Sequence, residues 1–330
     1  MYTIHGALAS PYSMKMRAAL RYRRITHVWS HGGHAQQIAA QKVKAPVIPV
    51  IEYPDGSFHN DSTPLLYDLE TRHAARSIVP EDEGSAFLAH LIEDFADEWL
   101  TKAMFGYRWL EEVDQVQMSR WLSFDAMKGG GLDNSQKAAE VFRDRQVGRM
   151  GIVGCTAENF ALIENSVRRV LRALEDHVVD EHWLFGSRPS LAEFGLFGQI
   201  SQLGVDPTAQ TMMRRDFPYT LRWLLHVDDA SGIEGQWDRP QAALRPVVRL
   251  ILAEIGRVYS PFLIANAAAF EAGEEMFRIE VGGLPYEQGT FKYQLKCLSD
   301  LRARYAALSL ATRERIDPVL REANCLEMLA

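Results

Sequence analysis

The stretch Val47-Ile48-Pro49-Val50-Ile51-Glu52-Tyr53-Pro54-Asp55-Gly56-Ser57-Phe58-His59-Asn60-Asp61-Ser62 decides the fold. Its first part is rich in β-branched residues and is short enough to be a buried strand. Pro54-Asp55-Gly56 has the chemistry of a turn, because proline fixes φ at a corner and glycine tolerates a positive φ. We therefore expect two short strands joined by this turn, with the first strand at 47–51 and a helix following to about Glu70.

Pro49 lies inside the first of these strands. Because proline has no N–H group, the strand must be an edge there or must be interrupted. A cis peptide bond before Pro49 is one such interruption, and it would turn the backbone of Ile48 outward to pair with an extended ligand. Asp61-Ser62 lies where the second strand ends and the helix begins. A helix N-terminus presents unpaired N–H groups and favours a carboxylate.

The residues before this stretch predict a small α/β unit. We expect strands at 2–5 and 25–30, and helices at about 13–24 and 36–44. A parallel strand pair joined by a helical crossover, followed by an antiparallel hairpin, fits this order. The first helix has an apolar face and is also strongly basic, with cations at Lys15, Arg17, Arg21, Arg23 and Arg24.

Three motifs in this segment occur in the order and spacing of one known domain. They are Ser10-Pro11-Tyr12-Ser13 before the first helix, Ile48-Pro49-Val50-Ile51, and Asp61-Ser62. Together they resemble the thioredoxin-like N-terminal domain of the glutathione transferase superfamily, in a bacterial type whose first loop carries Ser where other classes carry Cys. The resemblance implies a thioredoxin-like α/β domain at residues 1–76, followed by an all-helical domain.

The chain beyond a polar linker at 76–83 has helical periodicity almost throughout. Ser190-Leu191-Ala192-Glu193 predicts a capping box, in which Ser190 accepts from the N–H of residue 193 and Glu193 reaches back to the N–H of Ser190. This pattern resembles a folding motif of the superfamily, with Glu in place of Asp. We therefore expect the all-helical domain to cover residues 77–235.

Residues 236–330 form an extension that the common family pattern does not explain. We expect a helical extension that packs on the all-helical domain. Its predicted elements are a helix at 246–275 with a kink at Pro261, a short strand or turn at 278–283, and helices at 291–308 and near 318–329.

The resemblance assigns catalytic candidates to the first loop. A thiol attacks as thiolate, so a hydroxyl donor and a helix N-terminus aimed at the sulfur of glutathione would raise its ionised fraction. Ser10 is the first candidate for this donor, and Tyr12 and Ser13 are close alternatives. The competing interpretation is that Ser10 only caps the helix. The loop has no Cys, which argues against a mixed disulfide with glutathione.

The resemblance also assigns binding residues. The backbone of Ile48, before Pro49, is expected to pair with the cysteinyl part of glutathione. Asp61 is expected to hold the γ-glutamyl amine and Ser62 its carboxylate, and the alternative for both is an ordinary helix N-cap. Candidates for the glycyl carboxylate are Lys44, together with His34, Gln36 and Lys42.

Net charge, targeting signals and cysteine content limit the classes of binding partner and the cell compartment that we expect. The formal net charge of −7 over 330 residues argues against nucleic acid or an anionic membrane as the main partner. We find neither a signal peptide nor a membrane span in the sequence, so we expect a cytoplasmic protein. The three cysteines are far apart, which suits a reducing compartment. They are Cys155, Cys297 and Cys325.

Other candidate sites weaken when their spacing is considered. His27, His31 and His34 have no common face for a metal, so we expect no metal site. Gly129-Gly130-Gly131 lacks the Lys-Ser/Thr pair of a phosphate-binding loop.

The resemblance therefore implies a cytoplasmic enzyme that uses glutathione as co-substrate and conjugates or reductively cleaves a hydrophobic electrophile. Two alternatives stay open: an interaction protein with the same fold and no catalysis, and a glutathione-dependent isomerase. The resemblance implies a homodimer, which we expect to form through Leu65-Leu66 and Phe87–Leu91. Five aromatic residues either line an electrophile pocket or pack in the core: Phe105, Tyr107, Trp109, Trp121 and Phe124.

Overall fold

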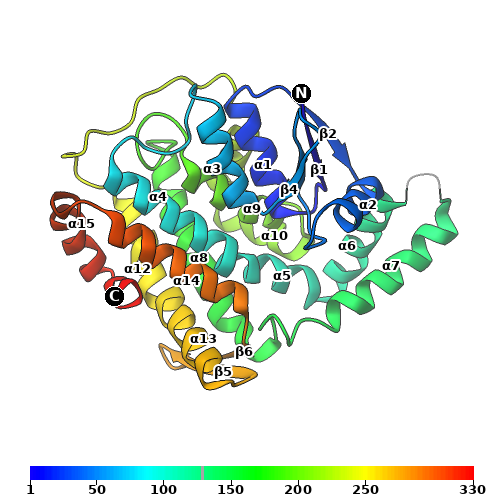
Figure 1. Cartoon of the computed structure of the whole chain (residues 1–330). Helices are drawn as coiled ribbons and strands as arrows, with labels where there is room; N and C mark the ends of the chain where they lie inside the picture. The colour runs from blue at the N-terminus through cyan, green and yellow to red at the C-terminus, as the bar shows by residue number, and fades with distance from the viewer. Residues whose placement is uncertain (128–129) are drawn as a thin grey trace. The chain divides into compact units, whose positions relative to one another are not determined.

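The computed structural model describes residues 1–127 and 130–330 and divides into two compact units (Figure 1). Unit 1 comprises residues 1–79, 107–148 and 193–234. Unit 2 comprises residues 80–106, 149–192 and 235–330. The segment predicted as one α/β domain lies within unit 1, the extension lies within unit 2, and the helical segment between them contributes to both. Gly129 of the Gly129-Gly130-Gly131 stretch lies outside the described residues.

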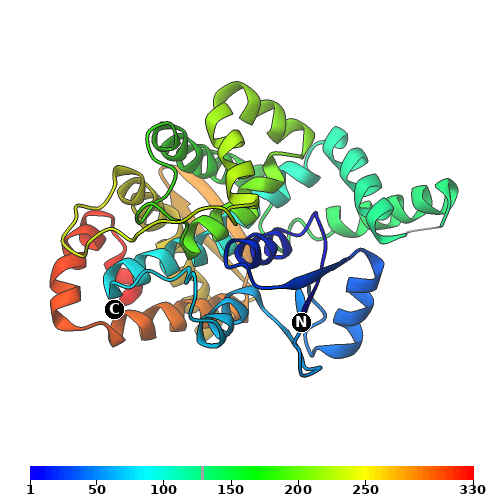
Figure 2. The same ribbon diagram turned by 90° about the horizontal axis from the view of Figure 1, so that it is seen from above.

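A four-stranded sheet forms the centre of the N-terminal segment. Its strand order is β2-β1-β3-β4, with β1 parallel to β2, and with β3 antiparallel to both β1 and β4. The strands are β1 (Tyr2–Gly6), β2 (His27–His31), β3 (Val50–Glu52) and β4 (Phe58–Asn60). The helices are α1 (Pro11–Tyr22), α2 (Gly33–Lys42) and α3 (Ser62–Arg72). α1 and α3 cover one face and α2 the other (Figure 2). The predicted thioredoxin-like fold is confirmed.

The predicted start of the third strand is wrong, because β3 begins at Val50 and not at Val47. The peptide bond between Ile48 and Pro49 is cis. Proline has no N–H to donate to the ladder, so regular pairing begins only after it. Val47 is 56% exposed. The predicted turn is present, since Gly56 has φ of 83° and its N–H donates to the Tyr53 carbonyl at 2.9 Å.

Several helices complete unit 1. They are α6 (Glu112–Ala126), α7 (Leu132–Val147), α10 (Pro207–Asp216) and α11 (Pro218–Asp228), with the end of α5 (Thr101–Trp109) and most of α9 (Leu191–Leu203). α6 and α7 lie side by side (Figures 1 and 2). This pair exposes apolar side chains at Val113, Trp121, Phe124, Leu132 and Val141.

Unit 2 is built from helices and one hairpin. Its elements are α4 (Glu83–Phe95), the π-helix η1 (Ala96–Leu100), α8 (Ala157–Val178), α12 (Pro246–Glu254), the π-helix η2 (Ile255–Tyr259), α13 (Ser260–Ala272), β5 (Met276–Val281), β6 (Leu284–Gly289), α14 (Lys292–Ala307), α15 (Leu310–Glu322) and α16 (Leu326–Leu329). α5 begins and α9 is capped within this unit. The Oγ of Ser190 accepts the N–H of Ala192 at 3.2 Å, directly before α9.

Two predictions for the extension need correction, and a third is incomplete. The expected single helix at 246–275 is divided by η2, which widens the turn just before Pro261, where a backbone N–H is missing. The expected short strand or turn at 278–283 contains both: β5 ends at Val281, and Gly282 and Gly283, both with positive φ, form the two-residue turn to the second strand β6. The helix expected from Pro318 begins at Leu310, where Ser309 accepts the N–H of Thr312 as a cap.

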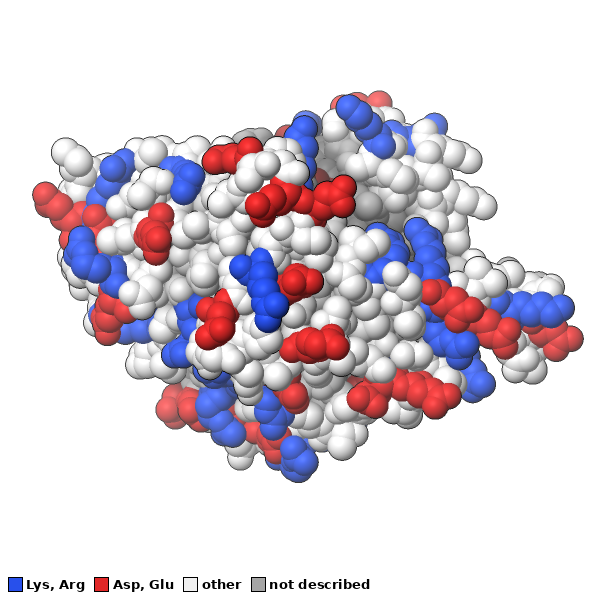
Figure 3. Space-filling model, turned by 90° about the horizontal axis from the view of Figure 1, so that it is seen from below, with Lys and Arg blue, Asp and Glu red and all other residues white. Residues whose placement is uncertain are grey.

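The predicted dimer contact residues are wrong. Leu65 and Leu66 are 3% and 1% exposed, and Phe87 and Leu91 are 4% and 0% exposed, so the chain's own core already covers them. No helix in the described ranges is long and apolar enough to cross a membrane. Lys and Arg side chains are interspersed with Asp and Glu over the face in Figure 3.

Candidate functional site

The sheet register brings the three sequence motifs to one end of the sheet. His5 of β1 pairs with Val50 of β3, and Val50 pairs with Asn60 of β4. The residues just beyond these pairs are Gly6 with the following loop, Pro49, and Asp61. Because the pairing is antiparallel across both contacts, these residues leave the sheet at the same end. The side chain of Asn60 also donates to the Ala45 carbonyl at 2.7 Å and holds the segment before Pro49 against β4.

Ser10 lies at the N-terminus of α1. Its backbone is extended, and its Oγ accepts the N–H of Ser13 at 3.3 Å. The capping interpretation of Ser10 therefore describes a real contact. This contact uses only an acceptor position of the Ser10 hydroxyl, so its O–H proton can still donate to a ligand. The positive end of the α1 dipole lies at the same place.

The other two hydroxyls of this loop differ in burial. Tyr12 is half-buried. Ser13 is 0% exposed, and a Cβ on Gly6 would lie 2.8 Å from the Ser13 Oγ, so this side chain packs directly against β1. Glycine at position 6 is what permits this approach. The burial of Ser13 argues against direct contact between its hydroxyl and a ligand, and leaves Ser10 and Tyr12 as the accessible pair.

Asp61 has a backbone conformation that non-glycine residues rarely adopt. Its φ is 79° and its ψ is 102°, and its side chain makes no capping hydrogen bond to α3. It is therefore not the ordinary N-cap that the competing interpretation proposed. A residue outside the favoured regions costs about 1–3 kcal/mol, and such residues concentrate at binding and catalytic sites.

Ser62 follows as the first residue of α3 and is 5% exposed. Lys15 of α1 is 0% exposed, and its Nζ donates to the Ser62 Oγ and to the Thr63 Oγ1, each at 3.2 Å. Sequence reasoning counted Lys15 only as one cation of a basic helix. Its spacing from Ala18 and Ala19, at i+3 and i+4, was the signal that it shares the buried face.

The residues expected to bind the glycyl carboxylate lie on exposed segments. Lys44 is exposed, as are His34, Gln36 and Lys42. The Lys42 Nζ lies 5.2 Å from the centre of the Phe58 ring, which ties it to β4. Ile48 is half-buried and Pro49 is buried. The register thus groups Ser10, Ile48, Pro49, Asp61 and Ser62 at one end, and Lys44 lies four residues before Ile48 in the chain.

Comparison with protein-family models gives two matches. The glutathione S-transferase N-terminal domain matches residues 4–77, and the glutathione S-transferase C-terminal domain matches residues 156–226. The chain belongs to the glutathione S-transferase superfamily. The extension from residue 235 lies outside both matched ranges, as do residues 78–155.

Solved structures similar to this chain have low sequence identity to it. A glutathione S-transferase from Methylobacillus flagellatus with glutathione bound is 16% identical, has a TM-score of 0.41, and covers 68% of this chain and 93% of its own. One from Xanthobacter autotrophicus is 17% identical, has a TM-score of 0.41, and covers 71% and 96%. A family member from Pseudomonas fluorescens with bound glutathione is 16% identical, has a TM-score of 0.37, and covers 75% and 97%. No curated protein sequence matches the chain.

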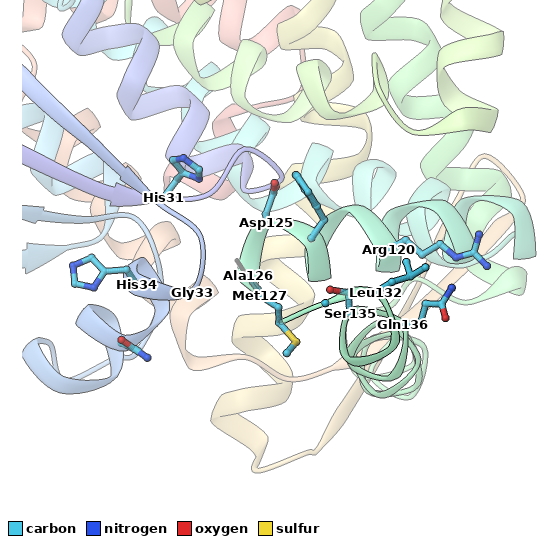
Figure 4. A pocket seen from close by; sticks show the side chains of 13 residues that line it. His31, Gly33, His34, Arg120, Asp125, Ala126, Met127, Leu132, Ser135 and Gln136 are labelled. Carbon is cyan, nitrogen blue, oxygen red and sulfur yellow. The ribbon is translucent and has the colours of Figure 1, made fainter. Parts of the chain in front are cut away.

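Unit 1 of this superfamily member contains a cavity of about 940 Å³ between the start of α2 and the α6–α7 pair (Figure 4). Its described lining residues are His31, Gly33, His34, Gln37, Arg120, Phe124, Asp125, Ala126, Met127, Gly131, Leu132, Ser135 and Gln136. Burial raises the pKa of the Asp125 carboxyl, and nearby His31 opposes that rise. Because His31 pairs with Gly6 in the sheet, this wall of the cavity begins at the sheet end that carries the first loop.

The five aromatic candidates for an electrophile pocket separate into different environments. Phe124 lines the cavity, and Trp121 lies on the exposed side of α6. Tyr107 and Trp109 are 5% and 1% exposed and pack in the core. Phe105 is half-buried.

The cysteines are all free and buried within unit 2. Burial raises the pKa of the Cys155 thiol to about 11 and that of Cys325 to about 12, and raises that of Cys297 well above its ordinary value. A neutral, buried thiol is a poor nucleophile. Within residues 1–127 and 130–330, no group of three or more His, Cys, Asp or Glu side chains is arranged to hold a metal.

Proposed function

We propose that the protein is a glutathione transferase that conjugates or reductively cleaves a hydrophobic electrophile. The observation that supports this most directly is the convergence of three segments at one end of the sheet: the Ser10 loop, the Pro49 segment and Asp61-Ser62. Two helix N-termini, those of α1 and α3, are found at the same end. Such a place favours a ligand with a thiolate and a carboxylate.

In this proposal each segment binds one part of glutathione. The backbone of Ile48 pairs with the cysteinyl residue. Asp61 attracts the γ-glutamyl ammonium group. Ser62 donates to the γ-glutamyl carboxylate, and Lys15 adds a positive charge directly behind it. Lys44 is the candidate for the glycyl carboxylate.

The reaction then needs an ionised thiol. The Ser10 hydroxyl donates to the glutathione sulfur and the α1 N-terminus stabilises its negative charge, with Tyr12 as the alternative donor. In conjugation, the sulfur lone pair forms a C–S bond to the electrophile and the leaving group departs with the bonding electrons. In reductive cleavage, the first glutathione sulfur bonds to the substrate carbon in the same way, and a second glutathione thiolate then attacks that sulfur. The C–S bond breaks, the carbon keeps the electron pair and takes up a proton, and glutathione disulfide leaves. The 940 Å³ cavity, with Phe124, Met127 and Leu132 in its lining, is the proposed seat of the electrophile.

Calorimetric titration with glutathione tests the proposal on the native protein and on Ser62→Ala. Hydrogen bonds to a charged group contribute about 1.5–3 kcal/mol, so we expect native binding that weakens at least about tenfold in the variant. Absence of binding to the native protein contradicts the transferase and favours an interaction protein. The homodimer also belongs to this proposal, and sedimentation showing a monomer at micromolar concentration would contradict it.

A further inference from the structure

Three buried polar side chains of unit 1 form a cluster behind the loop that carries Ser10. Arg108 comes from α5, Gln202 from α9 and Asp206 from the turn that precedes α10, and they are 3%, 2% and 0% exposed. The Arg108 guanidinium donates to both carboxylate oxygens of Asp206 at 3.0–3.1 Å and to the Gln202 Oε1 at 2.9 Å. The cluster is therefore a two-pronged ion pair extended by an amide.

Burying such a pair needs a reason beyond stability. Removing an arginine and a carboxylate from water costs several kcal/mol per ion, and apolar side chains of the same size often stabilise a core equally well. The cluster also makes hydrogen bonds to backbone outside it. The Nη1 of Arg108 donates to the Ala9 carbonyl at 2.9 Å, and the Nε2 of Gln202 donates to the Leu8 carbonyl at 3.2 Å. Both bonds point at the two residues that immediately precede Ser10.

Holding two consecutive carbonyls fixes the peptide planes on the approach to Ser10. The N–H of Ser10 in turn donates to the Ala7 carbonyl at 3.1 Å, which closes the loop into a tight turn. α9 supports the other side of this turn, because a Cβ on Gly198 would lie only 2.8 Å from the Pro11 carbonyl oxygen. The backbone on both sides of Ser10 is thus set by buried parts of helices α5 and α9.

We propose that Arg108, Gln202 and Asp206 are positioning residues that aim the Ser10 hydroxyl at the sulfur of bound glutathione. They act through the backbone of Leu8 and Ala9 and touch neither glutathione nor the electrophile. This inference rests on the proposed function and adds to it the device that sets the thiol pKa. A hydroxyl displaced by about 1 Å is too far away to stabilise a thiolate with a good hydrogen bond.

The test measures the thiol pKa of bound glutathione, from the pH dependence of thiolate absorbance, and turnover with 1-chloro-2,4-dinitrobenzene. Gln202→Met keeps size and neutrality but removes the bond to the Leu8 carbonyl. Arg108→Lys keeps the charge but loses the two-pronged geometry. In both variants we expect the thiol pKa to rise by about one unit and kcat to fall about tenfold, with KM for glutathione changed less than about threefold.

A matched control is the buried pair of Arg23 with Glu70, 2.9 Å apart, which bonds to the backbone near His73 and not to the first loop. Arg23→Lys should lower the melting temperature comparably and leave the thiol pKa unchanged. A double-mutant cycle adds a second criterion: in a Ser10→Ala background, Gln202→Met should change the thiol pKa no further.

The outcomes distinguish failure of the proposed glutathione transferase function from failure of the positioning role. Absence of glutathione binding to the native protein overturns the proposed function. Glutathione binding with an unchanged thiol pKa in Gln202→Met, or a pKa change that persists undiminished without the Ser10 hydroxyl, overturns the positioning role alone. If Arg108→Lys fails to fold, Gln202→Met still decides the question.

Discussion

Units 1 and 2 both bury polar side chains, but they direct them at different targets. In unit 2, Asn159 and Asn266 bond to the backbone at and just after the β5–β6 hairpin, at Glu287 and Phe291. Lys102, which is 4% exposed, donates to Gln288 in the same hairpin at 2.7 Å. In unit 1, Arg108 and Lys15 donate to segments that carry candidate site residues. The first set joins the β5–β6 hairpin region of the extension to the rest of unit 2, whereas the second set holds the segments that carry the candidate site residues.

Units 1 and 2 also differ in where they place strained backbone. Asp61, at the candidate site, has a φ of 79° with a ψ of 102°, outside the small left-handed region. In unit 2 the described non-glycine residue with positive φ is Asn324, a residue type that adopts this conformation readily. The difference teaches that changes in unit 2 should alter stability without altering ligand affinity, and that changes at the sheet end of unit 1 should alter ligand affinity.

The largest effect is expected in unit 2, from Asn159→Ala. The Asn159 side chain, 3% exposed, donates to the carbonyls of Gly154 and Glu287 at 3.0 and 2.6 Å and accepts the N–H of Glu287 at 3.1 Å. Loss of all three leaves backbone groups unsatisfied, so we expect a loss of about 3 kcal/mol in the free energy of unfolding. Denaturant unfolding followed by circular dichroism measures it.

The control for this variant is Asn134→Ala, which removes a single bond at an exposed position. It should change stability by less than about 0.5 kcal/mol. Glutathione affinity measured on folded protein should be the same in both variants. A drop in affinity for Asn159→Ala would remove the contrast between the units.

A smaller effect, on glutathione affinity and not on stability, is expected from Lys15→Met in unit 1. Methionine fills a similar volume, but it takes away the positive charge behind Ser62 and the donor that occupies the Ser62 Oγ. We expect glutathione affinity to fall about tenfold, because the Ser62 hydroxyl that donates to the γ-glutamyl carboxylate loses the positive charge behind it. Isothermal calorimetry checks this, with Arg21→Met as the control, which removes a half-exposed α1 cation that pairs with Asp228. Equal affinities in the two variants would show that Lys15 serves folding only.

Much of the fold follows from patterns within the sequence. The Pro54-Asp55-Gly56 turn and the helix after Asp61-Ser62 are local, and their residue types determine them. The second strand of the hairpin, β6, was missed because Pro285 at its start masks a strand pattern, and its partner β5 lies across a turn of two glycines. The π-helices η1 and η2 were also missed, since a widened turn leaves the apolar periodicity almost unchanged.

Sequence patterns mark the candidate site residues that stand in short motifs, and they do not mark side chains that the fold brings to these motifs from far along the chain. Ser10, Pro49 and Asp61 stand in short motifs. Arg108 and Gln202 are 99 and 194 residues from the loop carbonyls that they hold, and no local pattern marks them. The spacing of Lys15 from Ala18 and Ala19 indicates the buried face of α1, but it does not identify the Ser62 and Thr63 hydroxyls as the partners of this lysine.

The smallest effect is expected from Asp61→Gly, which separates strain from binding at one position. Glycine adopts the positive φ of residue 61 without steric cost, but it also loosens the unfolded chain, so the net gain in stability should be about 1 kcal/mol. Glutathione affinity should nevertheless fall several-fold, since the ammonium group loses its carboxylate partner. Asp61→Asn separates the two contributions, because it removes the charge and keeps the side-chain shape: stability should stay near the native value while affinity falls as in the glycine variant. Thermal unfolding and calorimetry on the three proteins measure both quantities. A destabilised Asp61→Gly protein would mean that the Asp61 side chain holds the fold together, and strain at the sheet end would then no longer distinguish unit 1 from unit 2.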